Sequence, residues 1–212
     1  MPDSRPTYFV AHFAIDDREE YGRYEKAFFP LFSGTGGTFM ALDDEAPVLE
    51  GEREPGRTVL LGYPSREALL EHWNSEPYQE IARHRRAGTT TYSIFLLEGL
   101  KGSAVPELEP GGEAVRLLAH FTIDDPEAFS AYEQGIVPSA APFGGRLLAY
   151  DDDPEILEGG RAPGRTALLE FDSEEALRQW WDSPGYRELA AIRQASTTTH
   201  SICFLKAMRV AP

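Results

Sequence analysis

Apolar and polar residues alternate along residues 8–15, which read YFVAHFAI. The apolar residues at odd positions from Phe9 to Ile15 would share one side of a strand, whereas His12 would lie on the other side. We therefore predict a strand with one face packed under helices. A histidine on the second face of so apolar a strand is a candidate functional residue.

The pattern returns 108 residues later, where AHFTIDD repeats the earlier AHFAIDD. The segments 8–97 and 116–205 align without a gap, with roughly 42 of about 90 positions identical. This period is too long for a solenoid and indicates a duplicated domain. We expect one repeat at residues 1–104, a linker rich in Gly, Pro and Glu at 105–113, and a second repeat at 114–212.

Each repeat predicts the order β-α-β-β-α-β. Asp16 and Asp17 would cap a first helix that Pro30 ends, as Pro138 would in the second repeat. Alternating or β-branched runs predict the strands, and the segments starting at Ser65 and Pro77 predict two helical stretches. The expected strands of the first repeat are residues 8–15, 38–42, 48–51, 57–63 and 89–97.

This order is the split βαβ arrangement of an α+β fold, with helices on one face of an antiparallel sheet. The other face would remain bare, and a second copy in the same chain could cover it. We therefore expect two ferredoxin-like units whose sheets pack face to face as an intramolecular α/β barrel. The chain would then be a monomer with the architecture of a dimer, and association of two such chains into a homodimer stays an alternative.

The composition argues against nucleic-acid-binding and membrane-binding functions. The chain has 35 acidic and 20 basic residues and a net charge of −15, so its surface field disfavours nucleic acid and anionic membranes as partners. Its start lacks a signal-peptide pattern, and no apolar run is long enough to span a bilayer, so we expect a cytoplasmic protein. The single cysteine, Cys203, excludes an intrachain disulfide.

Several shared motifs carry a family resemblance. They are the strand histidine, a helix tyrosine, Gly-Gly, Leu-Glu-Gly, S-x-E-A-L and W-x-S-x-x-Y. Together they resemble the family of domains of unknown function numbered 1330, which belongs to the dimeric α/β-barrel superfamily. The resemblance covers nearly the whole chain and implies the fold. It leaves the activity open, because that superfamily includes monooxygenases, isomerases, cyclases, haem enzymes and stress-response proteins.

The candidate acid-base residues are His12, His120 and Glu170. Both histidines would face the barrel interior, and Glu170 is expected to point inward near His120, where it could orient the imidazole. The first repeat has Gly62 at the position of Glu170, which would leave room for a ligand. The alternative interpretation is structural, with Glu170 paired to an arginine such as Arg165.

The candidate substrate-binding residues are Tyr24 and Tyr132 on the first helices, and Arg85 and Arg193 on the last helices. Their hydroxyl and guanidinium groups could bind a carboxylate or phenolate, or they could brace the helix layer. A third pair consists of hydroxyls on the expected interior strand faces, Ser93 and Ser201.

No sequence motif indicates a metal or a cofactor, and we expect neither, although His12 and His120 could meet across the barrel. Cys203 has no flanking basic residue and is expected to be an inert buried thiol. His200 is expected on the helix-facing side of the sheet or near the rim, and a role for it remains open.

The leading hypothesis is a cofactor-independent enzyme that uses acid-base chemistry on a small apolar or aromatic metabolite. Isomerase, cyclase, lyase and hydrolase reactions all fit. The alternatives are a non-catalytic small-molecule-binding or stress-associated barrel and a cofactor-free monooxygenase.

Overall fold

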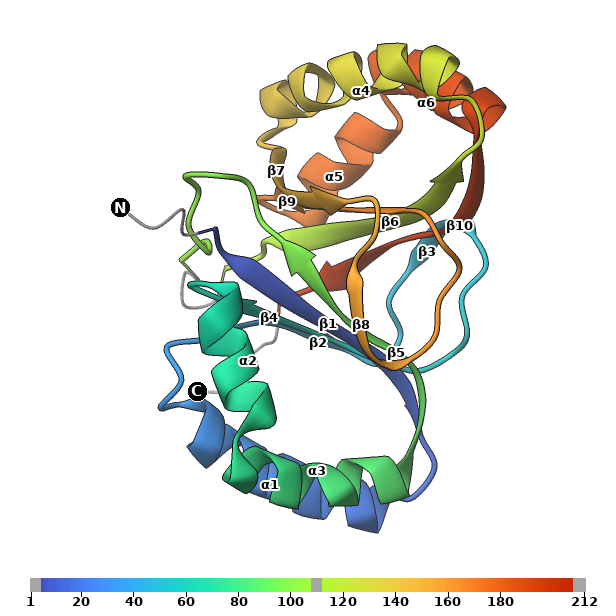
Figure 1. Cartoon of the computed structure of the whole chain (residues 1–212). Helices are drawn as coiled ribbons and strands as arrows, with labels where there is room; N and C mark the ends of the chain where they lie inside the picture. The colour runs from blue at the N-terminus through green and yellow to red at the C-terminus, as the bar shows by residue number, and fades with distance from the viewer. Residues whose placement is uncertain (1–4, 108–111, 208–212) are drawn as a thin grey trace. The chain divides into compact units, whose positions relative to one another are not determined.

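The structure, a computed structural model, describes residues 5–107 and 112–207. Two compact units are present, each an antiparallel sheet with helices on one face (Figure 1). Within the described residues, unit 1 comprises 5–45, 54–107 and 155–161, and unit 2 comprises 46–53, 112–154 and 162–207. The expected α+β class with two ferredoxin-like units is confirmed.

The sheet of unit 1 has the strand order β2-β4-β1-β5-β8. Helices α1, α2 and α3 cover one face of it (Figure 1). The elements of unit 1 are β1 (Thr7–Ile15), α1 (Arg18–Phe32), β2 (Thr38–Asp43), β4 (Arg57–Tyr63), α2 (Arg66–Asn74), α3 (Glu76–Gly88), β5 (Thr89–Glu98) and β8 (Glu155–Gly159).

The sheet of unit 2 has the order β3-β10-β6-β9-β7, and α4, α5 and α6 cover one of its faces. The elements of unit 2 are β3 (Val48–Gly51), β6 (Val115–Ile123), α4 (Pro126–Ala140), the 3₁₀ turn η1 (Ala141–Phe143), β7 (Arg146–Asp151), β9 (Arg165–Phe171), α5 (Glu174–Trp181), α6 (Pro184–Ser196) and β10 (Thr197–Lys206).

The two repeats exchange one short strand. β3 comes from the first repeat but pairs with β10 in unit 2, and β8 comes from the second repeat but pairs with β5 in unit 1. Each exchanged strand ends in a glycine with positive φ, Gly51 at +79° and Gly159 at +75°. A side chain at Gly51 would collide with the carbonyl of His200, so this ladder end requires glycine.

The exchange makes the compact units differ from the sequence repeats by two segments, 46–53 and 155–161. The repeat boundaries at 1–104 and 114–212 stay a prediction. Of the expected linker 105–113, residues 108–111 lie outside the described residues.

The helix-facing sides of the sheets carry the apolar positions that alternation predicts. Phe9, Ala11 and Phe13 of β1 are buried in one cluster with the aromatic side chains of α1. The register then places His12 on the other face, opposite Thr58 of β4. The period-two prediction is confirmed, and the face-to-face packing of the sheets stays a prediction.

The first helices begin as predicted and end later than predicted. Asp17 caps α1 by accepting hydrogen bonds from the backbone N–H groups of Glu19 and Glu20. Pro30 was expected to end this helix, and Pro138 its counterpart, but α1 continues to Phe32 and α4 to Ala140. Both prolines lie in the last turn, where the missing N–H removes one hydrogen bond and the helix still closes.

Candidate functional site

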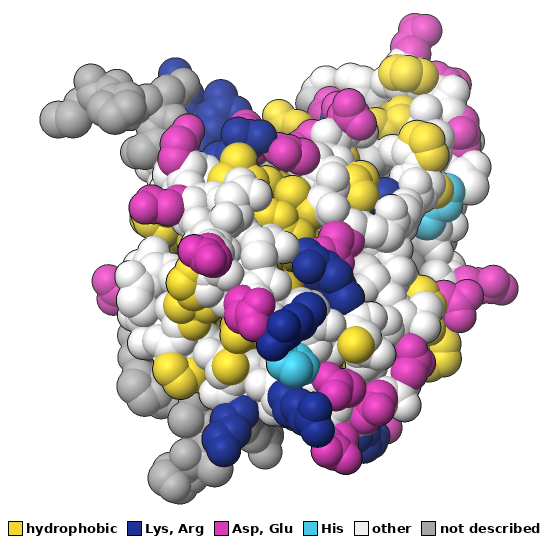
Figure 2. Space-filling model, turned by 60° about the horizontal axis from the view of Figure 1, so that its bottom comes forward, with side chains coloured by type: hydrophobic (Ala, Val, Ile, Leu, Met, Phe, Trp, Pro, Cys, Tyr) yellow, Lys and Arg dark blue, Asp and Glu magenta, His cyan; other side chains and the backbone are white. Residues whose placement is uncertain are grey.

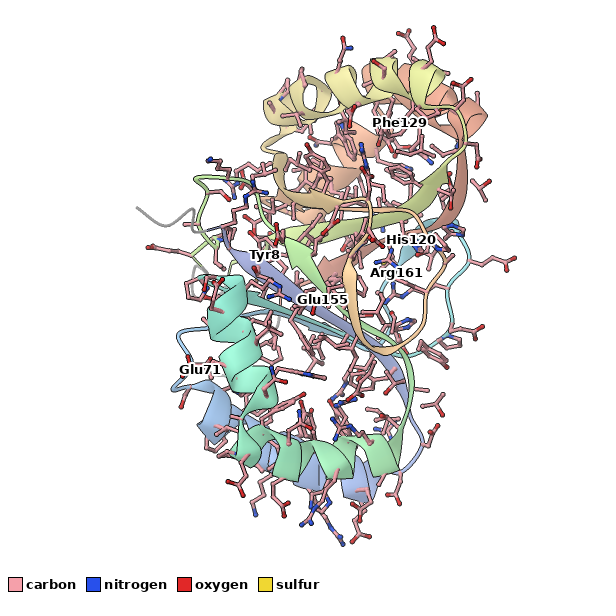
Figure 3. The ribbon with its side chains drawn as sticks, viewed as in Figure 1. Tyr8, Glu71, His120, Phe129, Glu155 and Arg161 are labelled. Atoms are coloured by element: carbon pink, nitrogen blue, oxygen red, sulfur yellow. The ribbon has the colours of Figure 1, made fainter. Side chains whose placement is uncertain are left out.

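Each unit contains a pocket between its helices and its sheet, but only the pocket of unit 2 is large. It encloses about 240 Å³, against about 30 Å³ in unit 1. An apolar cavity of about 150 Å³ is enough to hold benzene, so the unit 2 cavity has room for a two-ring compound. Figure 3 shows Phe129 of this cavity beneath the helices of unit 2.

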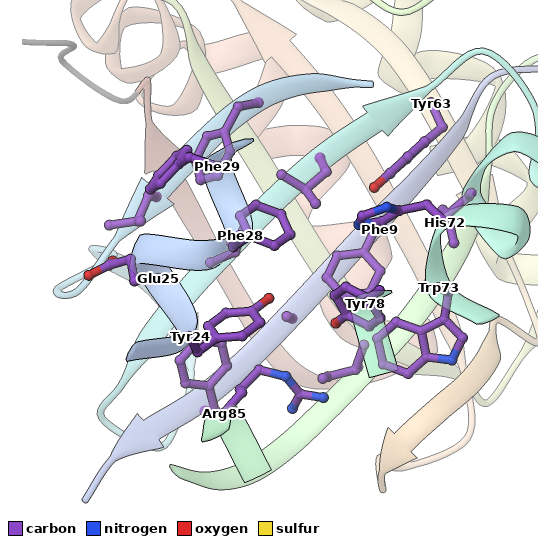
Figure 4. A pocket seen from close by; sticks show the side chains of 18 of the residues that line it. Phe9, Tyr24, Glu25, Phe28, Phe29, Tyr63, His72, Trp73, Tyr78 and Arg85 are labelled. Carbon is purple, nitrogen blue, oxygen red and sulfur yellow. The ribbon is translucent and has the colours of Figure 1, made fainter. Parts of the chain in front are cut away.

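Smaller side chains in the second repeat open the unit 2 cavity. Six lining positions carry a smaller side chain in the second repeat, namely Phe9 to Leu117, Tyr21 to Phe129, Phe28 to Ile136, Phe29 to Val137, Phe39 to Leu147 and Val59 to Ala167. Figure 4 shows Phe28 and Phe29 lining the pocket of unit 1. Two positions carry a larger side chain in the second repeat, because Tyr150 replaces Leu42 and Trp180 replaces His72. The Trp180 ring packs on Tyr186 at 4.0 Å between centroids, and its N–H donates to Ser139. The cavity therefore follows from the divergence of the repeats.

One end of the unit 2 cavity is polar. Tyr132 and Tyr186 line it, and both interact with Arg193, which is completely buried. Burial raises the pKa of Tyr132 to about 12 and also raises that of Tyr186, so both phenols are protonated at neutral pH and can donate hydrogen bonds. We call Tyr132, Tyr186, Arg193 and Glu50 the polar end.

Glu50 reaches the polar end on the exchanged strand β3. Its carboxylate accepts hydrogen bonds from both terminal nitrogens of Arg193, at 2.8 and 2.7 Å. Burial opposes its ionisation, but the hydrogen bonds from Arg193, Gln194 and Thr199 outweigh burial and lower its pKa to about 2. The Nε of Arg193 has no hydrogen-bond partner among the described residues.

Unit 1 contains the same cluster around a filled pocket. Arg85 donates to Glu158 of the exchanged strand β8 at 2.8 Å and lies with Tyr24 and Tyr78 (Figure 4). The predicted binding residues Tyr24, Tyr132, Arg85 and Arg193 thus border the two pockets. Tyr78, Tyr186 and the two exchanged glutamates were missed, although the repeated W-x-S-x-x-Y and Leu-Glu-Gly motifs contain all four.

The mouth of the unit 2 cavity carries charge. Arg165 forms ion pairs with Glu133 and with Asp152, and its guanidinium lies 5.1 Å from the ring centre of Tyr150. Val137 and Tyr150 line the cavity and are 39% and 48% exposed, so they lie where it meets solvent. These side chains therefore form the part of the cavity lining that meets solvent.

The histidines of the first strands lie away from both pockets. His12 is opposite Ser93 in the ladder, and its ring lies 4.9 Å from that of Tyr92. His120 is opposite Ser201, its Nε2 lies 3.0 Å from the carbonyl oxygen of Ala162, and its ring lies 4.5 Å from that of His200. Figure 3 shows His120 beside the strands and Phe129 under the helices. The structure thus brings each predicted serine next to its histidine.

Glu170 does not lie near His120, contrary to our expectation. It is opposite Arg116, whereas His120 is opposite Thr166, four residues away along β9. Arg116 donates two hydrogen bonds to Glu170, at 2.9 and 2.6 Å, and Arg146 donates one at 2.8 Å. A carboxylate held by two guanidinium groups is a structural ion pair, formed with these arginines and not with Arg165.

Gly62 leaves no room for a ligand, which corrects the second expectation. A Cβ at this position would lie 2.5 Å from Cγ1 of Val105 and 3.1 Å from the sulfur of Met40. The start of the linker therefore fills the space that Glu170 takes in unit 2.

Cys203 is buried as predicted, but a basic residue distant in sequence reaches it. Arg53 donates a hydrogen bond from Nη1 to its Sγ at 3.3 Å. Among the described residues, no group of three His, Cys, Asp or Glu side chains is placed to hold a metal ion. In the same part of the chain, no helix is long and apolar enough to cross a membrane.

Comparison with solved structures places the fold among α/β proteins of similar length. A monooxygenase candidate from Fusobacterium nucleatum is 11% identical, with a TM-score of 0.60, over 98% of this chain and 94% of that chain. A second monooxygenase candidate, from Lactobacillus acidophilus, is 14% identical, with a TM-score of 0.54, over 97% of both chains. An anthrone oxidase-like protein is 16% identical, with a TM-score of 0.51, over 99% and 97%. These likenesses show the fold alone.

No curated protein matches the chain. The family profile described as "Domain of unknown function (DUF1330)" matches twice, at residues 6–100 and 115–207. These matches cover both repeats and confirm the resemblance expected from the motifs. The chain belongs to the DUF1330 family and contains two copies of its domain in tandem.

Proposed function

We propose that the chain is a cofactor-independent enzyme that acts by acid-base chemistry on a small apolar or aromatic metabolite held in the unit 2 cavity. The observation that carries this proposal is a cavity of about 240 Å³ with apolar walls and one polar end. Such a combination of apolar lining and a few convergent polar groups is typical of small-molecule sites.

Two side chains of the cavity suit proton transfer next to a carbonyl group. Tyr132 donates a hydrogen bond to the substrate oxygen and stabilises the negative charge that develops there. Glu133, the next residue along α4, also lines the cavity and would accept the proton. The sequence predicted His120, His12 and Glu170 as the acid-base residues. These side chains lie on the sheet faces that point away from the helices and the pockets, so we assign the acid-base role to Tyr132 and Glu133 instead.

The proton-transfer proposal can be tested without the natural substrate. 2-Tetralone is a neutral two-ring ketone, and its α-protons exchange with heavy water once a base forms the enolate. We expect the protein to accelerate this exchange, measured by NMR, and Tyr132→Phe or Glu133→Gln to remove most of the acceleration. Binding of the ketone without acceleration would favour the alternative, a non-catalytic binding protein.

Cavity-filling variants provide the matched control. The first repeat shows that phenylalanine fits at two of these positions, so Ile136→Phe with Leu147→Phe should close the cavity and preserve the fold. Exchange of 2-tetralone should fall to the buffer rate while the melting temperature stays equal or rises. Unchanged exchange in this variant would contradict the proposed site.

A second candidate function is a cofactor-free monooxygenase. The structural likeness to two monooxygenase candidates and an anthrone oxidase-like protein favours it. Oxygen uptake on addition of 2-tetralone, measured with an electrode, would support this reaction. Proton exchange without oxygen uptake would favour the isomerase type.

A further inference from the structure

We propose that the unit 2 cavity selects an uncharged ring compound bearing a hydroxyl or carbonyl oxygen, and that Glu50 sets this selectivity by neutralising Arg193. The inference rests on the proposed function and adds the charge class of its substrate. It also assigns a specificity-determining role to a residue that the first repeat contributes to the unit formed mainly by the second.

The first step is the charge balance of the polar end. Arg193 is fully buried, and the carboxylate of Glu50 lies within 2.8 Å of both of its terminal nitrogens. A bidentate pair of this kind brings one positive and one negative charge together. The Arg193 charge is therefore compensated before any ligand enters.

The second step is the remaining polar surface of the cavity. At the mouth, Arg165 is compensated by Glu133 and Asp152. Tyr132 and Tyr186 are protonated and hydrogen-bonded to each other, so they present neutral hydroxyl groups. Among the described residues that line the cavity or lie at its polar end, every charged side chain thus has an opposite charge in contact.

The third step is the cost of burying a ligand charge. A carboxylate that leaves water for this cavity would find no uncompensated positive charge, and a buried unpaired charge is strongly disfavoured. A neutral oxygen loses less on leaving water and regains a hydrogen bond from a tyrosine. An unsubstituted hydrocarbon would gain no such hydrogen bond. A neutral oxygen-bearing ring therefore fits best.

Unit 1 supplies a matched control for Glu50. Glu158 holds Arg85 at 2.8 Å on the other exchanged strand, with its second oxygen accepting from Arg86, but the adjoining pocket encloses only about 30 Å³. Glu50→Gln and Glu158→Gln therefore remove equivalent carboxylates from the two units. Only the first change should alter ligand binding.

The experiment compares three probes with one ring system: 2-naphthol, naphthalene and 2-naphthoate. Titration calorimetry at neutral pH should give binding of 2-naphthol at least about tenfold tighter than of 2-naphthoate, and tighter than of naphthalene. Glu50→Gln should reverse the preference toward 2-naphthoate, because Arg193 is then uncompensated. Glu158→Gln should leave the order of the three probe affinities as it is in the unaltered chain.

The outcomes separate this inference from the proposed function. Tighter binding of 2-naphthoate to the unaltered chain, or the same reversal in Glu158→Gln, would overturn the charge inference alone. Binding of none of the probes, or binding unchanged by Ile136→Phe with Leu147→Phe, would overturn the proposed site itself. The probe series in the unaltered chain decides the charge class of the ligand even if Glu50→Gln does not fold.

Discussion

At the residue scale, position on a strand face decides what a side chain can do. His120 and Leu117 both lie on β6, but only Leu117 lines the cavity, because odd and even positions face opposite ways. A histidine in an apolar strand therefore indicates that it lies on the face opposite the apolar residues, but it does not indicate which site that face belongs to.

This placement predicts the effect of removing the imidazole. In His120→Ala we expect 2-naphthol to bind within about twofold of its original affinity, because the sheet separates the ring from the cavity. Titration calorimetry measures this. Loss of binding or of 2-tetralone exchange at an unchanged melting temperature would show that His120 contributes to the functional site.

The Glu170 cluster predicts a large effect on stability. Glu170→Gln would leave Arg116, which is 1% exposed, without its carboxylate, and breaking a buried pair costs about 3–5 kcal/mol. Denaturant unfolding measures the loss in the free energy of unfolding. Asp172→Asn is the control: this exposed carboxylate lies 3.4 Å from Arg146, and its removal should cost less than about 1 kcal/mol.

At the element scale, the exchanged strands connect stability to pH. The pKa of Glu50 falls from 4.5 to about 2 on folding, so its ion pair stabilises the folded state above about pH 4.5. This stabilisation is lost as the pH falls toward 2. We expect the melting temperature to fall across this window, and to fall less in Glu50→Gln, whose neutral amide does not titrate. Parallel curves would show that Glu50 is not responsible.

The elements were largely predictable from the sequence, and the exchange was not. Alternation on β1 and the Asp17 cap gave strand faces and helix starts, because both depend on residues close in sequence. The triplets Leu49–Gly51 and Leu157–Gly159 are identical, so the sequence cannot tell which sheet each one joins. The cavity was missed for a similar reason, because its size depends on how side chains from several elements fill one space.

At the scale of the whole molecule, the two repeats differ in how they fill their pockets. The first repeat has aromatic side chains such as Phe28 and Phe39 in its pocket, where the second repeat has Ile136 and Leu147. The chain carries a net charge of −15, and on the face in Figure 2 the basic side chains lie beside acidic ones. Both features agree with a neutral small-molecule ligand in unit 2.

The reciprocal exchange predicts how one repeat behaves alone. Residues 112–207 contain β10, the strand that receives β3, and β8, which carries the same Leu-Glu-Gly triplet as β3. A single copy cannot use β8 as in the full chain, because there it pairs with β5 of the first repeat. Two copies of the fragment can each donate β8 to the β10 of the other, which restores every ladder.

We therefore expect the fragment 112–207 to form a homodimer, measured by light scattering after size-exclusion chromatography. Glu158 would then take the place of Glu50 beside Arg193, so Glu158→Gln should weaken the fragment dimer. In the full chain the same substitution lies in unit 1 and should leave the unit 2 cavity unchanged. A folded monomeric fragment would show that β8 can return to its own repeat, and that the exchange is one of two accessible arrangements.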